Sequence, residues 1–147
     1  MRVLASVRLR AFAYPTEDEA KVKGALESLA PGVGFEERKV DATHGGAIRV
    51  FEARLTRRKE IEAFLRSLSP GVRETLAAER AKRTDESGHL FFRLDKQELV
   101  LGRQRLAGGG DTVVVECAVH GPRSRAAEAI EEALRGGLSR PGERGYL

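Results

Sequence analysis

Charged and amide side chains crowd into one short stretch of this chain. Arg93, Asp95, Lys96 and Gln97 lie within five residues of one another, and Arg83 stands ten residues upstream of Arg93. Guanidinium and ammonium groups bind phosphate, and an amide beside a cation can hydrogen-bond to base edges or sugar hydroxyls. The stretch therefore predicts a surface that contacts an anionic polymer, with Arg83, Arg93, Lys96 and Gln97 as the contacting residues.

The acidic residues of the same stretch could do a different chemistry. Asp85, Glu86 and Asp95 could in principle act as general acid and base,. Each has an arginine or lysine nearby in sequence, which favours surface ion pairs over a buried carboxylate. We therefore predict no catalytic residues. A solvated charged surface with no binding partner stays open as an alternative.

The residues that could bind a metal ion are scattered along the chain: His44, His89, His120 and Cys117. No C-x-x-C or H-E-x-x-H motif brings two of them together, so we expect neither a metal nor another cofactor. Cys117 alternates with valines and is predicted to be a buried, inert thiol. A lone cysteine cannot form a disulfide within the chain, which favours a cytoplasmic protein.

Two glycine-rich segments could let the backbone approach a phosphate. Residues 108–110 follow a predicted strand and precede another, whereas a phosphate-binding loop needs a helix N-terminus behind it,. They predict a hairpin turn. The segment His44-Gly45-Gly46 is either a plain turn or a loop in which His44 contacts a ligand.

The composition is that of one globular domain with a basic surface. The chain has 147 residues, a formal net charge of +4 and an isoelectric point near 9.6. We expect a single domain at residues 1–135 and a flexible glycine- and arginine-rich tail at 136–147. No apolar run approaches the length of about 20 residues that a membrane helix needs.

Hydrophobic periodicity predicts the elements that position these groups. Residues 1–14 alternate, so that Val7 and Leu9 face a core while Arg8 and Arg10 face away from it and join the predicted contacts,. Strands are predicted at residues 1–14, 34–40, 46–56, 89–94, 98–106 and 112–120, and helices at 57–67, 72–82 and 123–134, after a first helix that Thr16 caps and Pro31 ends,.

Adjacent strands and clustered helices in this order predict an α+β fold of two layers, with the helices packed on one face of a mostly antiparallel sheet. The other face of such a sheet is left to solvent or to a partner.

Three segments resemble an archaeal family of small RNA-binding proteins described as predicted exosome subunits, and the resemblance spans residues 5–120. They are A-F-A-Y-P-T-E-D-E-A-K-V-K-G-A-L at 11–26, T-H-G-G-A-I at 43–48, and R-T-D-E-S-G-H-L-F-F-R-L-D-K-Q at 83–97. The last is close to the family pattern R-x-D-E-x-G-x-L-Y-x-R-L-D-K-Q. Gly46 and Ala47 replace an Asn-Pro of the family, and Glu98 and Leu99 replace an alanine and an aromatic residue.

The resemblance implies a fold like that of the large-subunit ribosomal protein that holds 5S rRNA. It also implies RNA association and a link to the exosome or to ribosome biogenesis. We therefore expect a non-catalytic protein that contacts structured RNA, including rRNA, through phosphates and 2′-hydroxyls and without aromatic stacking. The alternative is an adaptor within an RNA-processing assembly that barely touches RNA itself. The sequence leaves the oligomeric state open.

Overall fold

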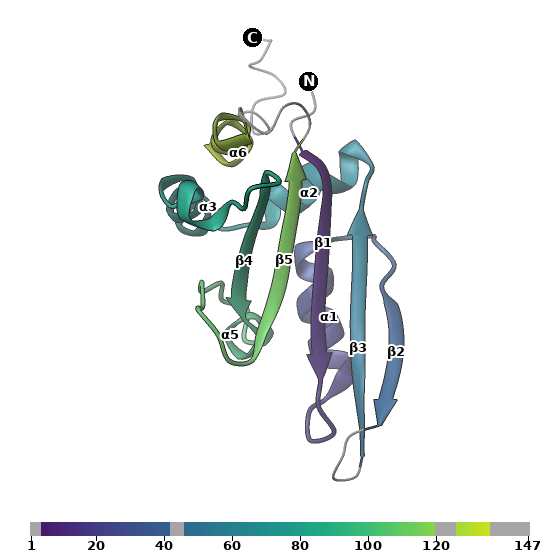
Figure 1. The fold of residues 1–147 in the computed structure, drawn as a ribbon. Coiled ribbons are helices and arrows are strands. Elements are labelled where there is room, and N and C mark those ends of the chain that lie inside the picture. The colour runs from purple at the N-terminus through teal and green to yellow at the C-terminus, as the bar shows by residue number, and fades with distance from the viewer. Residues whose placement is uncertain (1–3, 42–45, 120–125, 136–147) are drawn as a thin grey trace.

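A computed structural model describes residues 4–41, 46–119 and 126–135 of the chain (Figure 1). His44, His120 and the predicted tail at 136–147 lie outside the described residues. The strands are β1 (Leu4–Ala13), β2 (Glu36–Asp41), β3 (Ala47–Leu55), β4 (His89–Asp95) and β5 (Thr112–Val119). The helices are α1 (Glu19–Leu29), α2 (Arg58–Ser67), α3 (Pro70–Ala78), α4 (Arg80–Arg83), α5 (Lys96–Val100) and α6 (Ala126–Arg135).

The strands form one antiparallel sheet in the order β2-β3-β1-β5-β4. The long alternating strand β1 lies at its centre, with β3 on one side and β5 on the other. In this register Leu9 lies opposite Ala53 of β3 and Val115 of β5, and all three side chains are buried. The neighbouring positions Arg8 and Arg10 point to the other face, as alternation predicted,.

One face of the sheet carries the core, because α1, α2 and α5 lie behind it in Figure 1. Buried residues of these helices, such as Leu26, Phe64 and Leu99, pack in one cluster with the inward side chains of the strands. The prediction of an α+β fold with helices on one face of an antiparallel sheet is confirmed. No helix in the described part of the chain is both long and apolar enough to cross a membrane.

The predicted strand at 98–106 is wrong, and the reason is a helix cap. The Asp95 carboxylate accepts a hydrogen bond from the Glu98 backbone N–H at 2.9 Å and so begins the short helix α5,. Only Leu106 of the predicted strand returns to the sheet, as an isolated bridge to Leu94. The predicted cap of the first helix is also wrong, since Asp18 caps α1 instead of Thr16.

Candidate nucleic-acid interface

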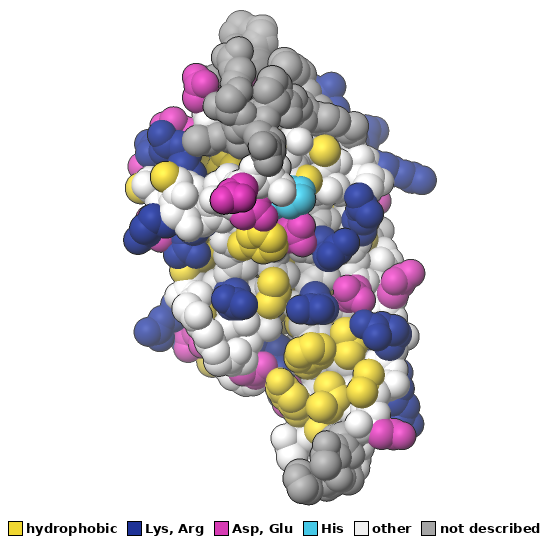
Figure 2. All heavy atoms as spheres, in the orientation of Figure 1, with side chains coloured by type: hydrophobic (Ala, Val, Ile, Leu, Met, Phe, Trp, Pro, Cys, Tyr) yellow, Lys and Arg dark blue, Asp and Glu magenta, His cyan; other side chains and the backbone are white. Residues whose placement is uncertain are grey.

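The open face of the sheet gathers arginines from three strands. Arg8 and Arg10 of β1, Arg54 of β3 and Arg93 of β4 are all exposed on it. Arg8 lies opposite Arg54, and Arg10 and Arg93 both lie opposite Val114 of β5. Figure 2 looks onto this face and shows its cationic side chains spread across the middle of the molecule. The fold thus places Arg8, Arg10 and Arg93, three of the predicted contacts, on one surface.

Few of these arginines are neutralised by a carboxylate. Arg8 lies 3.7 Å from Glu116 in a loose ion pair, and Arg10 lies over the Phe12 ring, 5.9 Å from its centroid. Arg54 and Arg93 form no ion pair with any carboxylate of the described residues. An exposed guanidinium group without a carboxylate partner can bind phosphate directly, because no ion pair within the protein has to be broken first.

Exposed aromatic rings accompany the arginines, contrary to the expected lack of stacking groups. Phe91, Phe12 and Tyr14 expose 39%, 37% and 38% of their surface. Phe12 follows Arg10 by two positions and Phe91 precedes Arg93 by two, so both rings share the arginines' face of the sheet,. The spacing of two residues between each ring and an arginine is visible in the sequence and could have predicted these exposed rings. The face therefore offers both phosphate-binding and base-stacking groups.

Arg83 borders this face but has an acidic partner. Its Nε and Nη2 both donate to Glu79 Oε1, at 2.9 and 2.7 Å. The hydrogen bond from Arg83 is the main reason that the pKa of Glu79 lies below its ordinary value. Arg83 and Arg93 line the same pocket at the edge of the sheet.

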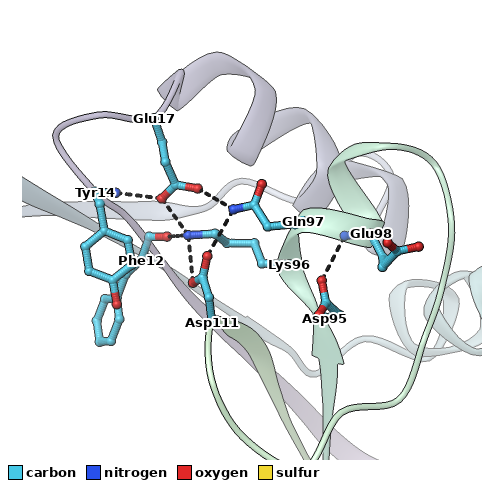
Figure 3. A network of polar contacts seen from close by, with 8 residues as sticks. All are labelled: Phe12, Tyr14, Glu17, Asp95, Lys96, Gln97, Glu98 and Asp111. Carbon is cyan, nitrogen blue, oxygen red and sulfur yellow. Dashed lines mark hydrogen bonds and ion pairs between the residues drawn. The ribbon is translucent and has the colours of Figure 1, made fainter.

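Lys96 belongs to a buried polar network instead of the open face of the sheet (Figure 3). It is 0% exposed, and its ammonium group binds Glu17 Oε1 at 2.7 Å, Asp111 Oδ1 at 3.0 Å and the Phe12 carbonyl oxygen. An ammonium group has three protons to donate, and these three oxygens accept all of them. The prediction that Lys96 contacts RNA is therefore corrected, because neither its position nor its hydrogen-bonding capacity leaves it available.

Gln97 joins the same network but, unlike Lys96, is exposed, so it stays a proposed contact. Its amide nitrogen donates to Glu17 Oε2 at 2.9 Å and to Asp111 Oδ2 at 3.1 Å. Two neighbouring side chains thus bridge the same two carboxylates. One carboxylate precedes α1 and the other precedes β5, so the network ties the end of β1, α5 and the start of β5 together.

Because of this network, the stability of the folded protein at low pH depends on Glu17. Burial by itself would raise the pKa of Glu17, but hydrogen bonds from Lys96, the Tyr14 N–H and Gln97 outweigh it and lower that pKa. A carboxylate with a lowered pKa in the folded state stabilises the protein above its ordinary pKa. That stabilisation is lost as the pH falls through the lowered value.

We therefore expect Glu17→Gln to flatten the pH dependence of stability below the ordinary carboxyl pKa of 4.5. Urea unfolding of both proteins at a series of pH values measures this, and the two curves should converge as the pH falls. Glu86→Gln is the control, since Glu86 is exposed and no cation of the described residues pairs with it. Parallel curves for the wild type and Glu17→Gln would contradict the assignment.

Two of the three carboxylates considered for acid-base chemistry, Asp85 and Asp95, serve local structure, and Glu86 is exposed. Asp85 accepts hydrogen bonds from the backbone N–H groups of His89 and Ser87, each at 2.9 Å, and the one from His89 is the main reason that its pKa is lowered. Asp95 caps α5. Among the described residues no three His, Cys, Asp or Glu side chains cluster so as to hold a metal ion. Cys117 is buried as predicted, and burial raises the pKa of its thiol to about 12.

The glycine segment near His44 is explained in part by a close approach of two chain segments. Gly46 has a φ of +77°, and a Cβ there would lie 2.8 Å from Cγ of Pro15. Only glycine fits this left-handed, crowded position without strain. The structure thus gives Gly46 a turn function.

Comparison with known proteins finds similarity to a family of RNA-binding proteins. A family model described as RNA binding matches residues 6–119. The RNA-binding protein PAB1135 of Pyrococcus abyssi is 32% identical over 141 residues, which cover 88% of this chain and 90% of that protein.

Two solved structures are also similar to this chain. Mth689 of Methanothermobacter thermautotrophicus, a DUF54 protein, superposes with a TM-score of 0.76 at 31% identity, covering 90% of this chain and 99% of that one. AF2318 of Archaeoglobus fulgidus superposes with a TM-score of 0.73 at 28% identity, covering 88% and 99%. The fold of this chain is therefore shared with these two archaeal DUF54 proteins.

Proposed function

The chain belongs to the RNA-binding family whose model spans its sheet, and from that premise we propose that it binds RNA on the open face of the sheet without acting as an enzyme. The observation that carries the proposal is the set of exposed arginines, Arg8, Arg10, Arg54 and Arg93, on the one face that no described helix covers. Arg83 borders the same face. His44 remains a proposed contact outside the described residues.

The arrangement suits a structured RNA. Arg54 and Arg93 stand three strand spacings apart, which is about 14 Å across the sheet,. Cations at such separations contact several phosphates at once and recognise the shape of a backbone more than its sequence. The exposed rings of Phe12 and Phe91 add stacking surface for unpaired bases,.

The proposal predicts a steep dependence of RNA affinity on salt. Four phosphate contacts on an RNA hairpin should make log K fall with log salt concentration with a slope of about −3. Arg54→Gln should reduce the size of that slope by about 1, because Arg54 has no carboxylate partner among the described residues. Fluorescence anisotropy titrations at several salt concentrations measure both values.

The matched control is Arg66→Gln, which removes an exposed arginine from α2 in the helical layer behind the sheet. It should leave the slope of the wild type unchanged. A flat salt dependence of the wild type, or an equal change in both variants, would argue against the open face as the RNA-binding surface.

We further propose that the protein is cytoplasmic, as its lone cysteine favours, and that it works with the exosome or in ribosome biogenesis, as the family resemblance implies. A second candidate is an adaptor that contacts a protein partner. The observation in its favour is an apolar area on the same face, formed by Phe12, Tyr14 and Val40, which are all exposed. Protein partners that stay bound after nuclease treatment, together with no RNA binding by the purified protein, would favour the adaptor.

A further inference from the structure

A pocket opens where the sheet face meets the segment between α5 and β5. Its volume is about 430 Å³, within the range of roughly 300 to 1,000 Å³ that is usual for ligand pockets,. The residues that matter for its chemistry are Arg83, Phe91, Arg93, Leu106, Gly108 and Val114. Thr84 bridges β4 at Leu90 and Leu106 bridges it at Leu94, so the pocket occupies the interval between two bridges on the outer edge of β4.

The lining combines positive charge with an aromatic surface and contains no carboxylate. Phe91 exposes its ring on the open face, and Leu106 and Val114 are partly buried apolar neighbours. Arg93 has no acidic partner among the described residues, whereas Arg83 is held in place by Glu79. A ligand that fits both features has a flat ring to stack on Phe91 and a negative charge for the arginines.

We propose that this pocket receives a single unpaired nucleotide of the bound RNA, with its base against Phe91 and its phosphate at Arg93. The inference rests on the proposed function, since the rest of the RNA would lie on the arginines of the open face. A paired base shows its flat faces only to its neighbours in the stack, so only an unpaired base can stack on an aromatic side chain.

The test compares RNA duplexes, each formed from two strands, that differ in one nucleotide. One duplex is blunt-ended and fully paired, and two others carry one extra adenosine, as a 3′ overhang or as a bulge. The wild type is expected to bind at least one of the unpaired forms about tenfold more tightly than the paired form, within the range for one base on an aromatic ring. Phe91→Ala should abolish this preference while it keeps most of the affinity for the fully paired duplex, which has no unpaired base to stack on Phe91.

Two neighbouring glycines offer a matched pair of variants that removes no contact of the fold. A Cβ at Gly108 or at Gly109 would meet nothing within 4 Å, and only Gly108 lines the pocket. Gly108→Leu should fill the pocket and abolish the preference for the unpaired adenosine. Gly109→Leu should retain it. Thermal unfolding of each variant shows whether the fold is intact.

The outcomes separate this inference from the proposed function. If all three duplexes bind equally well to the wild type, RNA binding stands and the nucleotide pocket is refuted. If none binds, both fail. Tight binding of free adenosine monophosphate, with no preference among the duplexes, would assign the pocket to a free nucleotide and overturn the proposal. Equal effects of the two glycine variants would also overturn it.

Discussion

Replacing Lys96 by methionine is expected to lower the free energy of unfolding by about 3–5 kcal/mol, the usual effect of breaking a buried ion pair from one side. Methionine keeps the unbranched apolar stem of lysine, without its terminal atom, and so leaves the carboxylates of Glu17 and Asp111 without the ammonium group that both bind. The Phe12 carbonyl loses its hydrogen bond as well. Two carboxylates held together around an apolar side chain would repel each other, and Glu17, whose side chain is 17% exposed, would be only partly solvated,.

Urea unfolding at neutral pH measures this loss. The control is Lys59→Met, which removes an exposed lysine that pairs with no carboxylate of the described residues and should change stability by no more than about 0.5 kcal/mol,. The triple variant Lys96→Met, Glu17→Gln, Asp111→Asn should recover part of the loss, because it removes the unpaired charges together with the cation. Equal stabilities of Lys96→Met and Lys59→Met would show that Lys96 is not buried in solution.

Reversing the charge of Arg10 and Arg93 together is expected to weaken RNA binding by about 100-fold. Each forms a charge-assisted contact with phosphate worth about 1.5 kcal/mol in the proposed complex, and two such contacts amount to a factor of this order. The new carboxylates would add repulsion. Both side chains are exposed and flank Val114, so Arg10→Glu with Arg93→Glu should leave the core intact.

A matched double variant makes this result specific to the open face. Lys59→Glu with Arg66→Glu lowers the net charge by the same amount but on α2, in the layer behind the sheet. It should weaken binding only through the long-range field, by a few-fold at low salt. Electrophoretic shift or anisotropy titrations compare the two variants. Similar losses in both would mean that RNA binds by net charge without using the sheet face.

Local pattern was sufficient for most of the fold and for part of the interface. Alternation in β1 separated Val7 and Leu9 from Arg8 and Arg10, because successive side chains of a strand point to opposite faces,. The same rule predicted that the side chains of Arg93 and Leu94 point to opposite faces of the sheet. Burial of the apolar series then decided which face was left to the arginines. The exposed rings of Phe12 and Phe91 follow the same alternation, since each lies two positions from an arginine of the open face.

The sequence by itself determined the five strands of the sheet, the inward apolar residues and the outward arginines, since these depend on neighbours two to four residues away, but it also predicted a strand at 98–106 that does not form. Only the tertiary structure decided that Lys96 is buried and that Gln97 hydrogen-bonds to the same two carboxylates. Asp95 begins a helix that turns Lys96 inward, and Glu17 and Asp111 meet its ammonium group from distant parts of the chain. A lysine is buried only where such partners offset its desolvation, and their meeting is a property of the folded chain alone.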